Sequence, residues 1–87
     1  MEIELSQNAL KDLKYWRKSG NVSIQKRISE LLVSTQEDSY NGIGKPEGLK
    51  YSLSGYWSRS INSEHRIIYE VVDDIVYIES FRGHYNS

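Results

Sequence analysis

The hydrophobic pattern of this chain changes its period once, and that change limits the folds open to it. From about residue 6 to residue 37, apolar side chains recur every three or four residues, whereas after Gly48 they alternate with polar ones. The first period is typical of helices and the second of strands. Helices followed by strands predict an α+β domain, with two helices packed on one face of an antiparallel β-sheet meander.

Two helices are expected in the first half of the chain. Ser6 is a plausible N-cap for a helix that runs to about Lys18, and Gly20 is placed to end it. Asn21 or Ser23 can cap the second helix. The apolar stripes of both helices are interpreted as core faces. They consist of Leu10, Leu13 and Trp16 or Arg17 in the first helix, and Ile24, Ile28, Leu31 and Leu32 in the second.

The other expected elements are strands. Ile3 and Leu5 alternate with glutamates, which suits a short edge strand at the N-terminus. Beyond a loop rich in glycine, a period of two predicts an antiparallel meander with tight turns. Its strands are expected at 49–53, 56–61, 65–72 and 75–81, with turns at 62–64 and 73–74.

The last hairpin allows the two faces of the sheet to be assigned. If Val72 pairs with Ile75 across the turn, the pairing continues until Arg66 faces Phe81. One face is then nearly all apolar and should take the helices, namely Ile67, Tyr69, Val71, Val76, Ile78 and Ser80. The other face is mixed and should stay open, with Arg66, Ile68, Glu70, Tyr77, Glu79 and Phe81.

Length, charge and composition exclude several classes of protein. Eighty-seven residues fit one domain, 1–87, with a small core. The net charge of -1 disfavours a protein that grips nucleic acid through its overall field. The absence of cysteine excludes disulfides and thiolate zinc sites, and no apolar window is long enough for a membrane span. The acidic N-terminus is unlike a signal peptide, so a reducing cytoplasm is expected.

Reactive side chains gather in four segments that are distant in the sequence. Together they supply a carboxylate, guanidiniums, an imidazole and a phenol, which are the groups needed to cleave a phosphodiester without a metal. Residue types alone leave other interpretations open. Glu47 could be a solvated loop residue, Arg66 could form an exposed ion pair with Glu64 or Glu79, and His84 could be idle. The four segments are KPEGLK (45–50), SR (58–59), HR (65–66) and RGHY (82–85).

The order and spacing of these motifs are much more specific than their residue types. The stretch KPEGLKYSLSGYWSRSINSEHRIIYEV and the closing FRGHY resemble the YoeB toxins of the RelE-like superfamily, as does the Tyr15-Trp16 pair of the first helix. The resemblance covers nearly the whole chain. It implies a RelE-like fold and a type II toxin that enters the ribosomal A site and cleaves the mRNA there, without a cofactor. It also implies a YefM-like antitoxin, operator DNA bound only through the antitoxin complex, and a homodimer.

The resemblance also implies a role for individual residues. Glu47 would be the general base, Arg66 would stabilise the phosphate, His84 would be the general acid and Tyr85 would align the reacting groups. Lys45, Lys50 and Arg59 would contact the substrate. The chain departs from many relatives in having Ser60 in place of a second arginine, and in the Asn86-Ser87 extension beyond the His-Tyr pair.

Three nearby side chains have other interpretations. His65 has the opposite parity to Arg66, so it should point toward the helices as a structural histidine. Trp57 is interpreted as a packing residue, and the role of Tyr56 stays open. The alternative for the whole chain is a catalytically weak interaction and co-repressor subunit that acts with an antitoxin. Pure binding would not require Glu47 and His84.

Overall fold

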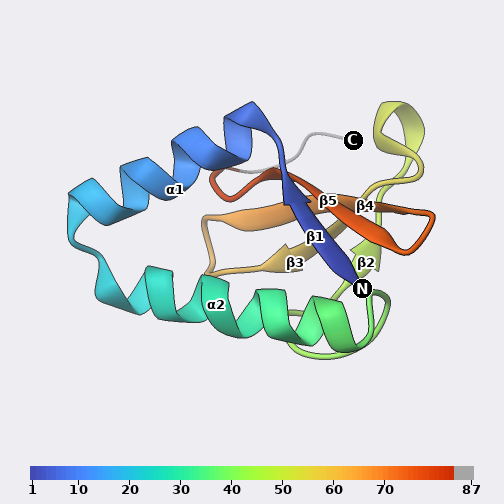
Figure 1. The fold of residues 1–87 in the computed structure, drawn as a ribbon, viewed down its shortest axis with the longest axis horizontal. Coiled ribbons are helices and arrows are strands. Elements are labelled where there is room, and N and C mark those ends of the chain that lie inside the picture. Colours follow the sequence, from blue (N-terminus) through green and yellow to red (C-terminus); the bar gives the residue numbers. More distant parts are fainter. Residues whose placement is uncertain (84–87) are drawn as a thin grey trace.

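The helical and strand halves of the sequence form two layers, as expected. The structure is a computed structural model that describes residues 1–83. Figure 1 shows the two helices side by side, with the strands behind and beside them. No helix among residues 1–83 is long and apolar enough to cross a membrane. The elements are β1 (Glu2–Leu5), α1 (Gln7–Ser19), α2 (Val22–Glu37), β2 (Glu47–Gly48), the 3₁₀ turn η1 (Tyr51–Leu53), β3 (Trp57–Ser60), β4 (Arg66–Val72) and β5 (Ile75–Ser80).

The sheet has five strands in the order β1-β5-β4-β3-β2. The strands from β2 to β5 pair antiparallel with their neighbours, which confirms the expected meander. The N-terminal strand β1 lies at one edge, as predicted, and it pairs parallel to β5 with Glu2 opposite Ile75. The two edge strands of the sheet, β1 and β2, are short, with four and two residues.

The helix ends follow the capping signals in the sequence. The Ser6 hydroxyl accepts a hydrogen bond from the Ala9 amide at 3.0 Å and so caps α1. Gly20 ends α1 in the left-handed conformation, with φ of 70°. Asn21, rather than Ser23, caps α2, because its side-chain oxygen accepts from the Ile24 amide at 3.1 Å.

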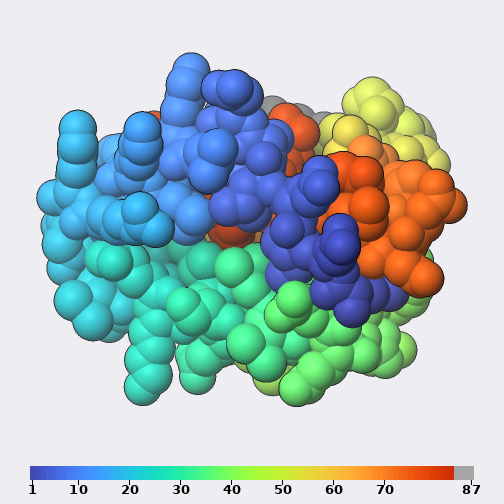
Figure 2. Space-filling view, viewed as in Figure 1, coloured from blue at the N-terminus to red at the C-terminus, as the bar shows by residue number. Residues whose placement is uncertain are grey.

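The core lies between the helices and one face of the sheet. Ile24, Ile28 and Leu31 of α2 are buried, as predicted. The prediction that Leu10 belongs to the core is wrong, because its side chain is 48% exposed. The buried residues of α1 are Ala9, Asp12 and Trp16, and Leu13 packs against the core, so the predicted positions of Leu13 and Trp16 are confirmed. Viewed from the helix side, the side chains of α1 and α2 cover the left part of the molecule in Figure 2.

A β-bulge at Glu79 changes the predicted register of the last hairpin. The pairing of Val72 with Ile75 is confirmed, and both turn aspartates between them have positive φ, as a two-residue hairpin turn requires. Tyr69 still faces Ile78, but Ile68 faces Ser80 instead of Glu79. Because of the extra residue, the side chains after it point to the face of the sheet opposite to the predicted one.

The bulge corrects the position of Phe81. That ring was expected opposite Arg66 on the open face, but it is fully buried in the core with Ile67 and Tyr69. The Glu79 carbonyl at the bulge accepts a hydrogen bond from the Ser6 hydroxyl at 2.8 Å. The N-terminus of α1 therefore supports the irregular part of β5.

The predicted strand 49–53 is also wrong. Residues 51–53 form the 3₁₀ turn η1, and the strand pairing with β3 is limited to Glu47 and Gly48. Tyr51 adopts a left-handed conformation with φ of 57° and is 80% exposed, so neither its backbone nor its side chain suits a sheet. The alternation of apolar residues was misleading here because only Leu49 is buried.

Arg59 is a buried cation at the centre of the fold. Its side chain is fully buried, and each nitrogen of the guanidinium donates to an oxygen. One partner is the phenol of Tyr69, whose pKa is raised chiefly because the group is buried. The acceptors are Tyr69 Oη (3.1 Å from Nε), Ser34 Oγ (2.8 Å) and the Ile43 carbonyl (3.1 Å) on Nη1, and the carbonyls of Asn41 (3.0 Å) and Asp38 on Nη2.

These contacts attach the loop after α2 to the sheet. Tight packing near Arg59 also explains two glycines of this loop, Gly42 and Gly44, which have φ of 125° and 83°. A Cβ on Gly42 would overlap Ser34, and a Cβ on Gly44 would lie 2.6 Å from Leu31 Cδ2. Both the backbone conformation and the lack of space therefore require glycine.

We expect the substitution Arg59→Met to lower the free energy of unfolding by about 3 kcal/mol or more, because it leaves several buried oxygens without a donor. The measurement is urea unfolding of both proteins. The matched control is Arg17→Met on the exposed surface of α1, which should change stability by less than about 0.5 kcal/mol. A loss for Arg59→Met as small as that of the control would contradict the structural role.

Candidate active site

Two of the predicted catalytic residues meet on the sheet. Arg66 Nη2 donates to Glu47 Oε1 at 3.2 Å. Glu47 lies on β2 and Arg66 on β4, and the intervening strand β3 supplies Ser58, whose hydroxyl accepts from Arg66 Nε at 3.0 Å. The guanidinium is therefore held at one nitrogen by a fully buried serine, while another nitrogen points to the carboxylate.

Strand pairing explains why these side chains share a face. Glu47 pairs with Ser58, and Ser58 pairs with Ile68, so these three residues point to the same side of the sheet. Arg66 lies two residues before Ile68 and therefore points to that side as well. This is the face opposite the helices, as the sequence predicted for Arg66.

The partner of Arg66 differs from the one considered from the sequence. An exposed ion pair with Glu64 or Glu79 was an open interpretation, but the observed carboxylate is that of Glu47. Glu64 instead lies 3.8 Å from His65 Nε2. The pair of Glu47 and Arg66 thus joins two sequence motifs that are 19 positions apart.

The ion pair is accessible to solvent and to a ligand. The side chain of Glu47 is 50% exposed and that of Arg66 is 21% exposed. A carboxylate can accept a proton, and a guanidinium can bind the oxygens of a phosphate through two N–H groups. The two groups are close enough to act on neighbouring atoms of one phosphodiester.

Two predicted substrate-binding lysines flank Glu47 in the chain. Lys45 and Lys50 are both exposed. Lys45 adopts a left-handed conformation with φ of 50°, and Lys50 is the residue before η1. Their positive charges favour the approach of a polyanion to the β2 edge of the sheet.

The prediction that Arg59 contacts substrate is wrong. Its side chain is fully buried, and its donors are used by the Tyr69 phenol, the Ser34 hydroxyl and loop carbonyls. Arg59 alternates with Ser58 along β3, so it points into the helix side of the sheet while Ser58 points to the open side. The parity of this strand could have indicated the correct assignment.

The other two predicted catalytic residues, His84 and Tyr85, lie outside the described residues. The chain that leads to them is described as far as Gly83. The Arg66 amide donates to the Gly83 carbonyl at 3.1 Å. The described part of the C-terminal segment therefore reaches the strand that carries Arg66.

Two aromatic interpretations from the sequence are confirmed. His65 packs edge-on against Trp16, with ring centroids 4.9 Å apart, and its Nδ1 accepts a hydrogen bond from the Gly83 amide at 2.9 Å. Trp57 is partly buried against the core, and its ring lies 4.9 Å from that of Tyr40. Both side chains have structural contacts on the helix side. Ser58, which anchors Arg66, had been assigned no role of its own from the sequence.

Negative charge acts on the end of β3 that is far from Arg66. The pKa of Tyr56 is raised, chiefly by the negative charge of Glu70 and to a lesser degree by burial and Glu79. Tyr56 precedes β3, whereas Ser60, at the other end of this strand, pairs with Arg66. We therefore expect a polyanion to favour the end of the sheet that carries Arg66.

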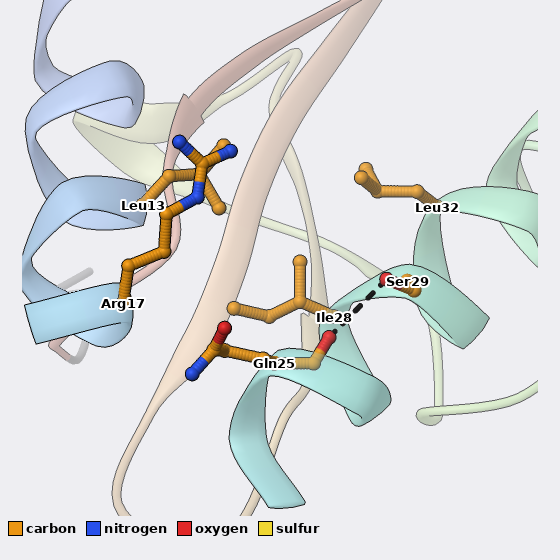
Figure 3. Close-up of a pocket in the computed structure, with 6 residues that line it drawn as sticks. All are labelled: Leu13, Arg17, Gln25, Ile28, Ser29 and Leu32. Atoms are coloured by element: carbon orange, nitrogen blue, oxygen red, sulfur yellow. Dashed lines mark hydrogen bonds between the residues drawn. The ribbon is translucent and has the colours of Figure 1, made fainter. Parts of the chain in front are cut away.

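A hollow between the two helices is separate from this site. Figure 3 shows it lined by side chains from α1 and α2, and none of the predicted catalytic residues is among them. Its volume of about 280 Å³ is small for a pocket that binds a metabolite. Among residues 1–83, no three His, Cys, Asp or Glu side chains are grouped as around a metal ion. The lining residues are Leu13, Arg17, Gln25, Ile28, Ser29 and Leu32.

The fold places the chain among small bacterial toxins. The structure of the YoeB dimer from Staphylococcus aureus superposes with a TM-score of 0.87 at 43% identity, covering 98% of each chain. YoeB in a heterotetrameric YoeB-YefM toxin-antitoxin complex from the same organism gives the same TM-score, identity and coverage.

The sequence comparisons identify the family. The family described as "YoeB-like toxin of bacterial type II toxin-antitoxin system" matches residues 5–85. Toxin YoeB of Escherichia coli is 42% identical over 85 residues, which cover 98% of this chain and all of that protein. The chain belongs to the YoeB family of type II toxins, as its motifs and its RelE-like fold predicted.

We expect Glu47→Gln to leave the free energy of unfolding within about 1 kcal/mol of the unchanged protein, because half-exposed ion pairs contribute little to stability. The measurement is urea unfolding at two salt concentrations, since salt screens such a pair. A loss comparable to that expected for Arg59→Met would mean that Glu47 has a structural role.

Proposed function

We propose that this protein is an endoribonuclease that cleaves mRNA in the A site of the ribosome and thereby inhibits translation. The contact between Glu47 and Arg66 on the open face is the observation that carries the proposal. A carboxylate within hydrogen-bond distance of a guanidinium supports the proposed roles of proton acceptor and phosphate-binding group, which the family motifs imply for these two residues. Proteins that only bind a partner have no need of this combination.

The proposed reaction is an attack of RNA on itself. Glu47 accepts the proton of a ribose 2′-hydroxyl, and the 2′-oxygen forms a bond to the adjacent phosphorus. The bond from phosphorus to the 5′-oxygen breaks, and this oxygen takes a proton from the general acid. The products are a 2′,3′-cyclic phosphate and a free 5′-hydroxyl. The proposed reaction is complete in atoms and protons without a redox step, a metal or another cofactor.

Arg66 stabilises the charge that develops on the phosphoryl oxygens. Its Nε stays bonded to Ser58, so the guanidinium keeps its direction while the substrate replaces the Glu47 contact at Nη2. The Glu47 carboxylate, beside the bound phosphate, then acts as the base. The resting ion pair holds both groups near their working positions.

The remaining roles follow the family resemblance. His84 donates the proton to the leaving 5′-oxygen, because an imidazole can carry a proton near neutral pH. Tyr85 aligns the reacting groups. Lys45 and Lys50, both exposed, bind phosphates of the mRNA on either side of the scissile bond.

Dependence on the ribosome follows from charge and geometry. A carboxylate is a weak base for a sugar hydroxyl, so the in-line arrangement of the attacking oxygen must supply much of the rate. A protein of net charge -1 has little means to impose this geometry on free RNA. The ribosome already holds the message in place, so the toxin needs to add only the catalytic groups.

The similarity to relatives supports two further partners. The solved relatives include a YoeB dimer and a YoeB-YefM complex. We extend both to this chain: a homodimer of a single domain, 1–87, and inhibition by a YefM-like antitoxin. The complex would bind operator DNA through the antitoxin. The toxin would act in the cytoplasm, where it meets ribosomes.

We expect Glu47→Gln and Arg66→Lys each to reduce the rate of cleavage of ribosome-bound mRNA by at least about 100-fold, because each removes a group that acts on the transition state. Cleavage is measured by primer extension on mRNA with a defined A-site codon. The matched controls are the substitutions Glu30→Gln on α2 and Arg17→Lys on α1, both at exposed positions. These variants should cleave at the rate of the unchanged protein. Full activity of a well-folded Glu47→Gln variant would exclude Glu47 as the base.

We expect the unchanged protein to cleave ribosome-bound mRNA at least about 100-fold faster than the same mRNA free in solution, because the ribosome supplies the geometry. The measurement compares cleavage of one transcript with and without 70S ribosomes. Equal rates would contradict the ribosome dependence. If neither substrate were cleaved while the protein still bound its antitoxin, the chain would act as an interaction and co-repressor subunit instead.

A further inference from the structure

The segment after β5 is fixed to the rest of the fold by side chains that the proposed reaction does not use. The Phe81 amide donates to Asp12 Oδ2 at 2.9 Å, and the Phe81 carbonyl accepts from Trp16 Nε1 at 3.0 Å. Both partners come from the buried face of α1. These contacts explain why a carboxylate and an indole N–H, which are costly to bury alone, point into the core.

The next two residues are held as well. The guanidinium of Arg82 lies over the ring of Tyr15, 3.9 Å from its centroid. The Gly83 amide donates to His65 Nδ1 at 2.9 Å, and the Gly83 carbonyl accepts from the Arg66 amide at 3.1 Å. Every described residue after β5 therefore has a defined partner.

The imidazole of His65 is itself held in one orientation. Its ring packs edge-on against Trp16 with an interplanar angle of 81°, and Trp16 packs in the same manner on Tyr15. Because Nδ1 accepts a hydrogen bond from a backbone amide, the proton of the neutral ring is on Nε2. Glu64 lies on that side, at 3.8 Å from Nε2.

We propose that His65 is a positioning residue for catalysis: its Nδ1 fixes Gly83, the residue that precedes His84 in the sequence, beside Arg66. The inference rests on the proposed function, in which His84 is the general acid. His65 precedes Arg66 in the sequence but points to the opposite face. His65 therefore anchors Gly83 from the helix side, while Arg66 carries the proposed phosphate-binding group on the open side.

Packing alone does not account for this arrangement. A phenylalanine at position 65 could fill the same space and keep the edge-on contact with Trp16. What it would lack is an acceptor for the Gly83 amide. An asparagine is smaller, but its side-chain oxygen can occupy a position close to that of Nδ1. The two substitutions therefore separate the packing of His65 from its hydrogen bond.

The experiment measures single-turnover cleavage of ribosome-bound mRNA by the full chain and by His65→Phe and His65→Asn, over a range of toxin concentrations. We expect His65→Phe to lower the rate at saturation at least about tenfold, because a small displacement of a catalytic group is costly. The concentration that gives half of this rate should change less than about threefold. His65→Asn should cleave within about threefold of the unchanged protein, because it keeps the acceptor.

A second measurement is independent of activity. Hydrogen exchange at the Gly83 amide should be at least about tenfold faster in His65→Phe than in the unchanged protein and should be restored in His65→Asn. The exchange of amides in β4 away from Gly83 should stay unchanged, which checks that the variants are folded.

The outcomes separate this inference from the proposed function. An active unchanged protein whose His65→Phe variant saturates at the same rate would overturn the inference alone. Equal losses in both variants, with the Gly83 amide still protected, would overturn it as well. An unchanged protein that cleaves no ribosome-bound mRNA would overturn the proposed function. In that case, unaltered hydrogen exchange of the Gly83 amide in His65→Phe would also refute the role of His65 in holding Gly83. Faster exchange would support that role.

Discussion

The buried guanidinium of Arg59 is the interaction on which the position of the site depends. It is fully buried on the helix side of the sheet. Its N–H groups donate hydrogen bonds to oxygens of α2, of Tyr69 and of the loop that follows α2. The large apolar residues of that loop, Tyr40 and Ile43, stay substantially exposed, so hydrogen bonds to a buried charge contribute much of its order. The same loop continues into β2, where Glu47 meets Arg66.

Alternation along two neighbouring strands separates structural from functional groups. On β3, Arg59 points inward and Ser58 outward, while at the start of β4 His65 points inward and Arg66 outward. The inward pair organises the loop before Glu47 and the segment after β5. The outward pair forms the floor of the candidate site. A domain of this size can therefore build a precise site because each strand contributes to both faces.

Sequence reasoning found the parts of this arrangement that depend on local pattern. The helix caps, the stripe of α2, the turn at Asp73-Asp74 and the open face of Arg66 all follow from period or turn chemistry. It failed where a distant contact overrides the pattern. The Glu79 carbonyl at the bulge accepts a hydrogen bond from Ser6, and the buried carboxylate of Asp12 accepts one from the amide of Phe81.

The candidate site was predictable to a similar extent. The motifs indicated that Glu47 and Arg66 should be near each other, since they follow a known family order, and the structure brings them to 3.2 Å. They did not indicate that Arg59 is buried, because an arginine in a short strand is expected to be exposed unless the alternation of the strand is taken into account.

The parallel pairing of β1 with β5 affects the timing of folding. Glu2 has no partner until Ile75 has been synthesised, so the growing chain carries an unpaired first strand through most of its translation.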